Sequence, residues 1–507
     1  MNQILIHRTQ DSPVPAQQEL TGVESAQIGV ASKQVPLVLD LDGTLLRGDL
    51  LFEGIAGLVR ANPLNLFKIG AWALRGRAFL KQRVAEASPL DYTSLPANEA
   101  LAAYAAGQKE AGRQIVIATA ADENAAQRFA VRFAFVDTII ASDGATNLKG
   151  ETKASLLQWR FPQGFDYAGD SAADLPVWKA CRKMILVEPS RRVAAAAAAL
   201  GAPELLIEKP SRWKVLAKGL RLHQWAKNAL VFAPLLLSGM ALEAGAWLAA
   251  GAAFIGLGLA ASATYLINDL VDLPHDRQHR SKSRRPLAAG HLGLPLACGA
   301  AAAGLAGGLA VSALAGWATA SAVAVYVAVT LSYSFALKRA PFVDALTLAS
   351  LFTLRLVIGG IAVSAVASVW LLTFSMFLFT SLSLAKRHVE IAHARRTRGV
   401  QTISGRGYRS DDEPVVAGFG IAAAVASVLI FVLYLVNEAF KHSAFTFAPL
   451  LWAFPCVLFL WLGRIWLLCG RHEMDDDPVA FSIRDRISIF AGAATLAIFA
   501  LAMALPG

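Results

Sequence analysis

Long apolar stretches dominate the second half of the chain. Most of them reach the length of about 20 residues that a helix needs to cross a bilayer. Nine such stretches occur, at 229–241, 244–266, 292–314, 316–335, 342–365, 368–385, 414–436, 444–469 and 487–505. Backbone polar groups in lipid must be satisfied within the segment, so these stretches predict an all-α membrane domain of nine transmembrane helices. The hydrophobic fraction of 55% agrees with a protein that lies partly in a bilayer.

Charged residues are distributed unevenly among the loops of this domain. The loops after the second, fourth, sixth and eighth stretches carry nearly all the charge, and those on the other side hold almost no Lys or Arg except Lys441. The positive-inside rule therefore places the charged loops in the cytosol of a bacterial-type inner membrane. The net charge of +10 is explained by these loops, which suit anionic lipid or phosphate ligands, so we expect no nucleic-acid partner.

The remaining chain divides into three segments by composition. We expect a disordered tail at 1–34, an α/β domain at 35–208 and a linker with interfacial character at 209–228, before the membrane domain at 229–507. The tail has no apolar run long enough for a signal peptide, which keeps the α/β domain on the cytosolic side. The four cysteines show no metal-binding or redox spacing and predict no disulfide.

Three short apolar runs in the α/β segment end in polar residues. "VPLVLD" leads into "LDGT", "RQIVIATA" contains Thr119, and "FDYAGDSAAD" contains Asp170 and Asp174. Helical segments separate these runs, which predicts a doubly wound parallel sheet. Residues 49–95 predict a small helical cap, and the sequence leaves open whether its apolar and basic faces lie on the membrane surface instead.

Two carboxylates two residues apart on one strand point to the same side, as phosphoryl transfer to a carboxylate requires. One must attack phosphorus beside Mg²⁺ and a cation, and the other must protonate the leaving alcohol. Taken alone, "DGT" is also typical of an exposed turn after a core strand. Lys149 and Lys153 both qualify as the cation, and Lys153 is favoured because the apolar helix "ASLL" follows it.

All four motifs together, in this order, resemble the haloacid dehalogenase (HAD) phosphatase superfamily over 35–208. The resemblance implies that Asp40 is the nucleophile and Asp42 the general acid and base. Thr119 and Lys153 would hold the phosphoryl group. The carboxylates around Mg²⁺ would be those of Asp40, Asp42, Asp170 and Asp174.

A second polar cluster stands at the cytosolic end of the second apolar stretch. In "NDLVDLPHDRQHRSKSRRPLAAG" four residues recur at helical spacing, which lets them share a face and hold Mg²⁺: Asn268, Asp269, Asp272 and Asp276. The following Arg277, Lys282, Arg284 and Arg285 suit diphosphate oxygens. A solvated helix end with mixed charges is the alternative.

This segment resembles the first aspartate-rich motif of UbiA-type intramembrane prenyltransferases, and "YSFALKR", with Tyr333 and Lys338, agrees. The second aspartate cluster of that family is missing, and its loop reads "KRHVEIAHARR" and "GRGYRSDDE" instead. Together with "LRLHQWAKNALVFAPLL" and "DDPVAFSIRDR", these segments are similar to the decaprenyl-phosphate phosphoribosyltransferase branch over 215–507. The branch implies that Asp269 and Asp272, with Asp276, hold Mg²⁺ at the diphosphate of phosphoribosyl diphosphate, and that polyprenyl phosphate is the acceptor.

Basic residues near the cytosolic ends of the stretches are candidates for gripping phosphates: Lys227, Arg284, Arg285, Lys338, Arg355, Lys386, Arg387, Arg406 and Arg409. Some of them serve only orientation or lipid contact. Asn228 and Tyr408 are candidates for the mouth of the site. Glu390 lies four residues after Lys386, where an intrahelical ion pair is as reasonable as a catalytic role.

The sequence therefore predicts an enzyme that transfers 5-phosphoribosyl to polyprenyl phosphate, fused to a phosphatase that removes the 5′-phosphate and leaves polyprenyl-phosphate-ribose. Tethering the two activities raises the local concentration of the intermediate. Three alternatives stay open: a transferase of prenyl diphosphate to a non-sugar acceptor, a phosphatase with a separate substrate or a regulatory role, and a transporter. Self-association, lipid chain length and the later use of the ribose are left open.

Overall fold

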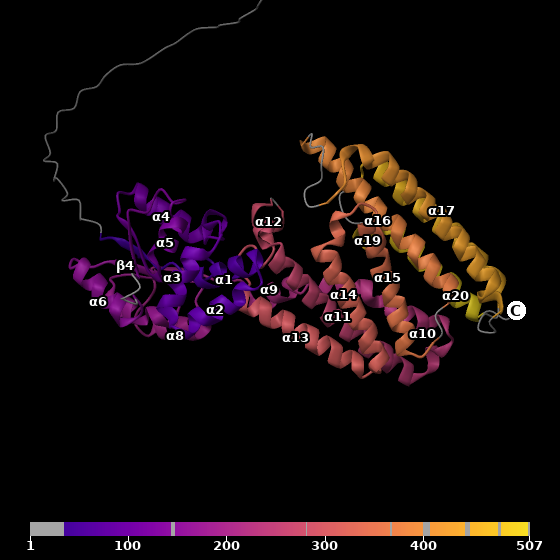
Figure 1. The fold of residues 1–507 in the computed structure, drawn as a ribbon, viewed down its shortest axis with the longest axis horizontal. Coiled ribbons are helices and arrows are strands. Elements are labelled where there is room, and N and C mark those ends of the chain that lie inside the picture. The colour runs from indigo at the N-terminus through magenta and orange to yellow at the C-terminus, as the bar shows by residue number, and fades with distance from the viewer. Residues whose placement is uncertain are drawn as a thin grey trace, which may run out of the picture.

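The computed structural model describes residues 35–142, 148–279, 281–365, 368–398, 406–441, 447–474 and 478–504. The expected tail at 1–34 lies outside them. Figure 1 shows two parts side by side, an α/β part built from the N-terminal third and an all-helical bundle. The expected division into an α/β part and a membrane-type bundle is therefore visible in the fold.

A six-stranded sheet forms the centre of the first part, with the order β3-β2-β1-β4-β5-β6. Every neighbouring pair is parallel. The strands are β1 (Leu37–Leu39), β2 (Ile115–Asp122), β3 (Thr138–Ser142), β4 (Asp166–Gly169), β5 (Met184–Val187) and β6 (Leu205–Ile207). This order reverses between β1 and β4, the point at which open α/β sheets bind ligands. The prediction of a doubly wound parallel sheet is confirmed.

Helices cover both faces of this sheet. Those outside the cap are α4 (Glu99–Glu110), α5 (Glu123–Ala130), α6 (Glu151–Arg160), α7 (Leu175–Ala180) and α8 (Arg191–Ala198). Successive side chains of β1 enter different cores: Leu37 and Leu39 pack in one hydrophobic cluster and Val38 in another. This alternation is the two-residue period of a strand that is buried on both faces.

Three helices lie in the region after β1 where the cap was expected: α1 (Leu50–Ala61), α2 (Asn65–Leu74) and α3 (Arg77–Ala87). Asp49 caps α1, because its side chain accepts hydrogen bonds from the backbone N–H groups of Leu51 and Phe52. The three helices pack on one another around Leu58, Ile69 and Val84. They form a small unit with its own apolar centre.

Seven described helices are long and apolar enough to cross a bilayer, rather than the nine expected. They are α11 (Ala244–Val271), α13 (Leu294–Ala313), α14 (Trp317–Phe335), α15 (Val343–Ala362), α16 (Val369–Arg398), α17 (Glu413–Asn437) and α18 (Ala453–Gly470). Shorter helices complete the bundle: α9 (Arg212–Gly219), α10 (Ala233–Leu237), α12 (Leu273–Gln278), α19 (Pro478–Arg484) and α20 (Arg486–Ala504). The chain is a multi-pass membrane protein.

The first and last expected spans account for the difference. Residues 229–241 do not form one helix, because the chain winds as a 3-10 helix over Leu222–Phe232 and then as the short α10, with Pro234 in its first turn. A five-residue helix rises only about 8 Å, far less than a bilayer core. This segment packs inward instead, and Val231 and Leu235 are fully buried. At the other end, the apolar stretch of α20, Arg486–Ala502, falls short of a full span.

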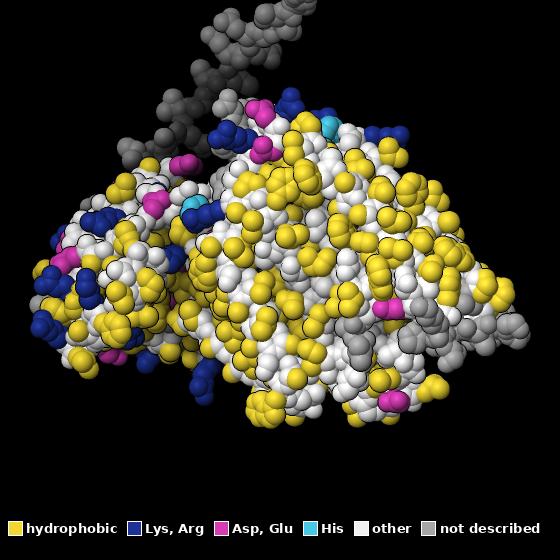
Figure 2. Space-filling view, turned by 45° about the vertical axis from the view of Figure 1, so that its right-hand side comes forward, with side chains coloured by type: hydrophobic (Ala, Val, Ile, Leu, Met, Phe, Trp, Pro, Cys, Tyr) yellow, Lys and Arg dark blue, Asp and Glu magenta, His cyan; other side chains and the backbone are white. Residues whose placement is uncertain are grey.

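Hydrophobic side chains cover the flank of the bundle, while most of its charged side chains lie along its upper edge in Figure 2. The ends of α11, α14 and α16 and the starts of α13, α15 and α17 share this charged edge, as the predicted loop pattern requires. The α/β part adjoins it, since α1 contacts α13. The aspartates at the end of α11 and the α/β part therefore lie on the same side of the bundle.

Candidate functional site

A cavity of about 350 Å³ opens at the carboxyl ends of the central strands. Asp40 directly follows β1, Thr119 lies within β2 and Asp170 directly follows β4. Parallel strands present their carboxyl ends at one edge, which brings residues 130 positions apart to the same place. All six residues predicted for the α/β site line this cavity: Asp40, Asp42, Thr119, Lys153, Asp170 and Asp174.

A chain of hydrogen bonds crosses the floor of the cavity. Lys153 Nζ donates to Asp40 Oδ1 at 2.7 Å and to the Tyr167 hydroxyl at 2.9 Å. The Tyr167 hydroxyl in turn donates to Asp174 Oδ1 at 2.7 Å. All four side chains are buried, so each polar group depends on the next for its partner. Of the two candidate lysines, Lys153 makes this contact, while Lys149 lines the same cavity.

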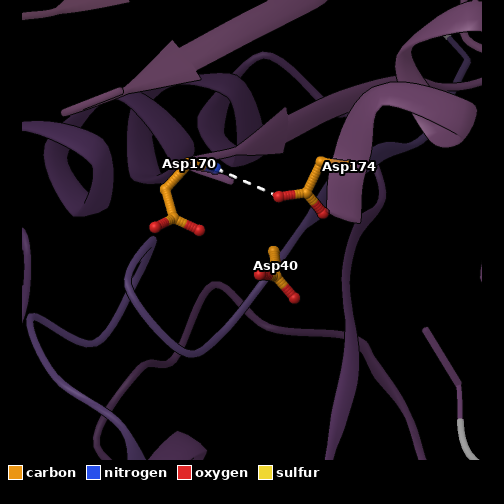
Figure 3. A group of neighbouring side chains, drawn as sticks. All are labelled: Asp40, Asp170 and Asp174. Carbon is orange, nitrogen blue, oxygen red and sulfur yellow. Dashed lines mark hydrogen bonds between the residues drawn. The ribbon is translucent and has the colours of Figure 1, made fainter. Parts of the chain in front are cut away.

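Three carboxylates meet in this cavity (Figure 3). Asp40, Asp170 and Asp174 each offer an oxygen atom, and these atoms lie within 4.8 Å of one another. Asp174 is held in place because its Oδ2 accepts hydrogen bonds from the backbone N–H groups of Asp170, at 3.3 Å, and Ser171, at 3.0 Å. Oxygen ligands without sulfur or nitrogen suit a hard divalent cation such as Mg²⁺. These three residues could hold such an ion.

Burial makes the charged forms of these carboxylates costly. It raises the pKa of Asp170 to about 8, with repulsion from Asp40 and Asp174 added. Burial also raises the pKa of Asp40 to about 6, although Lys153 acts in the opposite direction. For Asp42, burial and the nearby Asp49 raise the pKa to about 7. A carboxyl group with a pKa near neutrality can both give and take a proton.

Asp42 lies near the N-terminus of α1, apart from the three carboxylates of Asp40, Asp170 and Asp174. Its Oδ1 accepts a hydrogen bond of 2.9 Å from the backbone N–H of Leu50. Thr119 is buried in β2, and its Oγ1 accepts a hydrogen bond from the Ala121 N–H. Neither residue belongs to the group of three that could share a metal ion. The structure thus separates Asp42 from the metal ligands with which it was grouped.

The sequence analysis missed two residues that line the cavity, Arg77 and Lys81, and one that hydrogen-bonds to its lining, Tyr167. Arg77 and Lys81 reach it from α3 of the cap, and Lys81 Nζ donates to the Ala120 carbonyl at 2.6 Å. Tyr167 lies within β4 and reads as an ordinary core aromatic residue. The basic run of the cap was visible in the sequence, but nothing in it showed that α3 turns this run toward Asp42.

Gly43 permits the close approach of the first and last motifs. Its φ of +80° is in the left-handed region, and a Cβ there would lie 2.5 Å from Asp170 Oδ2. Glycine is the residue that meets both conditions without strain. The glycine of "DGT" is therefore required by the close packing of Asp170 as well as by the turn.

The aspartates at the end of α11 are paired with arginine and lysine. Arg285 Nη1 contacts Asp276 Oδ2 at 2.5 Å and Asp269 Oδ1 at 3.1 Å, and Arg221 Nη2 contacts Asp269 at 2.5 Å. Asp272 turns elsewhere, and both its oxygens accept from Lys338 Nζ at 3.1 Å. Among the described residues, the trio already placed to share an ion is that of the α/β part, so the role of these carboxylates as Mg²⁺ ligands stays a prediction. Half-buried Asn268 lies beside them on α11.

A second ionic cluster surrounds Asp344, which the sequence analysis overlooked. This fully buried carboxylate at the start of α15 lies 2.8 Å from Arg387 Nε and 3.4 Å from Arg406 Nη1. The Tyr408 hydroxyl donates to it at 2.7 Å. Glu390 completes the cluster, since it pairs with Arg387 and lies 3.3 Å from Arg406. The predicted basic residues Arg387 and Arg406 are thus brought together as counterions of the buried Asp344 and the half-buried Glu390.

The remaining candidates are spread over the bundle, and Arg355 lies past the middle of α15. Arg355 is buried and donates to Asn228 Oδ1 at 3.0 Å and to the Tyr326 hydroxyl at 2.8 Å. Lys227 Nζ lies 5.8 Å from the centre of the Phe352 ring. Lys386 is half-buried, and Arg284 and Arg409 are exposed. The structure does not bring these six into one cluster.

Comparison with known proteins identifies the family of the bundle. The model of the UbiA prenyltransferase family matches residues 231–504. The chain belongs to this family. A relative from Sinorhizobium fredii, the uncharacterized protein y4nM, is 38% identical over 474 residues and covers 93% of this chain and 92% of its own. The predicted UbiA membership is confirmed.

Two further similarities concern the UbiA part alone. A decaprenyl-phosphate phosphoribosyltransferase of Mycolicibacterium smegmatis is 39% identical over 186 residues, which cover 36% of this chain and 58% of that enzyme. A solved UbiA homolog from Archaeoglobus fulgidus, bound to GPP and Mg²⁺, shares 16% identity with a TM-score of 0.43, covering 56% of this chain and 99% of its own.

Proposed function

We propose that the UbiA bundle transfers 5-phosphoribosyl from phosphoribosyl diphosphate to polyprenyl phosphate, and that the α/β part then removes the 5′-phosphate. The product is polyprenyl-phosphate-ribose. The observation that carries the proposal is the presence, in one chain, of 39% identity to a phosphoribosyltransferase and of a carboxylate–lysine cavity. The positive-inside pattern supports a cytosolic position for both sites in this proposal.

Two features of the bundle support a sugar-phosphate donor. Helix α16 supplies Arg387, and the segment that follows it supplies Arg406. By the sequence resemblance, UbiA prenyltransferases carry a second carboxylate cluster in this region. Guanidinium groups bind phosphate oxygens in a forked geometry. Arg285 and Arg221 supply two more such groups at the aspartates of α11, where both contact Asp269. In the proposed reaction the lipid phosphate oxygen attacks C1 of the ribose while the C1–O bond to the diphosphate breaks.

In the α/β part, Asp40 is the proposed nucleophile. Its carboxylate oxygen attacks the 5′-phosphorus, the bond from phosphorus to O5′ breaks, and Asp42 gives its proton to O5′. Asp42 then takes a proton from the water that hydrolyses the aspartyl phosphate and releases inorganic phosphate. Lys153, 2.7 Å from Asp40, offsets charge on the phosphoryl oxygens. A Mg²⁺ ion held by Asp40, Asp170 and Asp174 would supply further charge neutralisation to the same oxygens.

The test uses the purified full chain with Mg²⁺, polyprenyl phosphate and phosphoribosyl diphosphate, and mass spectrometry of the lipid products. Wild-type protein should yield lipid-linked ribose, and the Asp40→Asn variant lipid-linked ribose 5-phosphate. Asp91→Asn, which changes an exposed carboxylate in a turn, is the matched control and should behave as wild type. Absence of a lipid-linked pentose from every sample would refute the transfer, and ribose without phosphate from Asp40→Asn would refute the second step alone.

A second candidate is the transfer of a prenyl group from a prenyl diphosphate to a non-sugar acceptor. The description of the matched family and the GPP complex of the homolog favour it. In that case the α/β part would act on a separate phosphate ester. Diphosphate release from geranylgeranyl diphosphate, without any from phosphoribosyl diphosphate, would select this candidate.

A further inference from the structure

Helix α2 of the cap presents an apolar face that no residue described by the structure covers. Its face consists of Leu66, Phe67, Gly70, Ala71 and Leu74, which recur at helical spacing. The Phe67 side chain is 80% exposed and Leu74 is 91% exposed. The opposite side of the helix is anchored, because Ile69 is buried in the centre of the cap. A continuous apolar face of this kind marks an interaction site.

The charge around this face has one sign. Residues 54–85 contain six cations and no acidic residue: Arg60, Lys68, Arg75, Arg77, Lys81 and Arg83. Lys68 and Arg75 are exposed beside the apolar face. An apolar face bordered by Lys and Arg is typical of helices that lie in the interface of an anionic bilayer. A second copy of this chain is a poor occupant, since a self-complementary contact would bring these cations against each other.

The position of the cap places α2 next to the bilayer. Helix α1 contacts both α2 and the membrane-spanning α13, and Figure 1 shows α1 and α2 on the side of the α/β part that faces the bundle. Gly290, just before α13, fits against the Arg47 backbone and Pro96 of the α/β part, where a Cβ would clash. Arg277 of the UbiA bundle forms an ion pair with Glu53 of α1. The cap is therefore fastened at the charged end of the bundle.

We propose that the α2 face docks on the headgroup region of the bilayer that holds the UbiA bundle, with Leu66, Phe67 and Leu74 inserted and Lys68 and Arg75 on anionic lipid phosphates. The docking requires no catalytic activity and is independent of the proposed reaction. The docking nevertheless bears on that reaction, because only Arg75 and Gly76 separate α2 from α3, whose Arg77 and Lys81 line the cavity. A lipid-linked substrate would then reach that cavity along the membrane surface.

The test places a fluorescent label at Phe67→Cys in the full chain, with the four native cysteines replaced by serine, in vesicles containing phosphatidylglycerol. Trp159→Cys on α6 is the matched control, since Trp159 is 75% exposed and α6 lies far from the bundle. Nitroxide-labelled lipid should quench the label at 67 and leave that at 159 unchanged. A water-soluble quencher should do the reverse.

Equal access of the water-soluble quencher to both labels would overturn the proposal. So would protection of position 67 that disappears when the protein is diluted in lipid, because a second copy would then be the occupant. Replacing Lys68 and Arg75 by Glu should reduce lipid quenching at 67. The equilibrium constant for docking of the α2 face on the bilayer should fall by about fivefold or more for each cation removed. Vesicles of phosphatidylcholine alone should reduce lipid quenching at position 67 to the same extent. Unchanged quenching both with the Glu replacements and with phosphatidylcholine vesicles would show that the two cations do not bind anionic lipid.

Discussion

Arg277 and Glu53 form a bidentate ion pair that joins the two parts of the chain. Arg277 Nη2 and Nη1 donate to the two carboxylate oxygens of Glu53 at 2.6 and 3.0 Å, and both side chains are 4% exposed. Arg277 directly follows Asp276, the last aspartate of the cluster in the UbiA bundle. Glu53 lies in the first turn of α1, where the Leu50 N–H is bonded to Asp42. One ion pair thus connects elements that carry both proposed sites.

We predict that Glu53→Gln loosens the cap from the bundle. Removing one partner of a buried pair leaves the Arg277 charge uncompensated, at a cost of about 3–5 kcal/mol. Thermal unfolding of the protein in detergent should begin at lower temperature, and protease should cut near residues 209–221 more readily. The double variant Glu53→Leu with Arg277→Leu should recover most of the loss, since both charges are removed.

Glu86→Gln is the matched control for this prediction. It breaks the Arg83–Glu86 pair, whose side chains are 49% and 42% exposed, so its expected cost is below about 1 kcal/mol. An equal loss of stability in Glu53→Gln and Glu86→Gln would contradict a structural role for the pair between the two parts.

We predict that Gly43→Ala abolishes the phosphatase activity. The new methyl group would meet Asp170 Oδ2 and require a left-handed backbone, which costs roughly 1–2 kcal/mol by itself. Asp170 must move, so the carboxylate trio loses its geometry. Gly107→Ala in α4 adds a methyl group to open space and should keep full activity with slightly higher stability. Release of inorganic phosphate from a sugar phosphate measures the effect, and normal release from Gly43→Ala would argue against the close approach.

We predict that Mg²⁺ stabilises the α/β part more as the pH rises. The raised pKa values mean that the folded protein holds protons on these carboxyl groups more tightly than the unfolded chain does. The stability that these protons contribute is fully present below the ordinary pKa of 3.8. It is lost as the pH passes about 6 for Asp40, about 7 for Asp42 and about 8 for Asp170. Mg²⁺ competes with these protons and replaces their effect.

Urea unfolding of the full chain at several pH values between about 5 and 8.5, with Mg²⁺ or with EDTA, checks this prediction. The EDTA samples should lose stability with rising pH, and the Mg²⁺ samples should lose less. Asp170→Asn should remove most of the difference. A Mg²⁺ effect that is equal at every pH would show that the cation binds elsewhere.

We predict that Arg285→Gln impairs diphosphate use and that Arg284→Gln does so far less. Arg285 alone of the two bridges Asp269 and Asp276, whereas Arg284 is exposed. Loss of charge-assisted bonds worth about 1.5–3 kcal/mol should raise KM for the diphosphate donor by roughly tenfold to a hundredfold. Steady-state release of diphosphate measures both variants, and equal KM values would remove Arg285 from the proposed site.

Much of the architecture follows from local patterns in the sequence. The parallel sheet was predicted because buried strands and helices alternate, and seven of nine spans because apolar length alone decides whether a helix can cross a bilayer. The prediction of a span at 229–241 was wrong, because the length of an apolar segment does not show whether lipid or protein surrounds it. Pro234 and the inward packing of Val231 turn that segment into the bundle.

The chemistry of the polar residues divides in the same way. The order of Asp40, Thr119, Lys153 and Asp170 along the chain was enough to predict one cavity, because parallel strands bring their ends to one edge of the sheet. Helical spacing put Asp269, Asp272 and Asp276 on one helix end. It could not reveal that Arg285 lies between two of them and that Lys338 draws the third away.

The sequence by itself therefore determined the two-part architecture, the family of the bundle and the six predicted residues of the cavity in the α/β part. Only the tertiary structure decided the partners of the buried charges: Tyr167 for Lys153, Arg387 for Asp344 and Arg277 for Glu53. The physical reason is that periodicity and spacing report on neighbours within one element. A buried charge is satisfied by whichever group the packing of distant elements brings within a few ångströms, and no local pattern in the sequence records that choice.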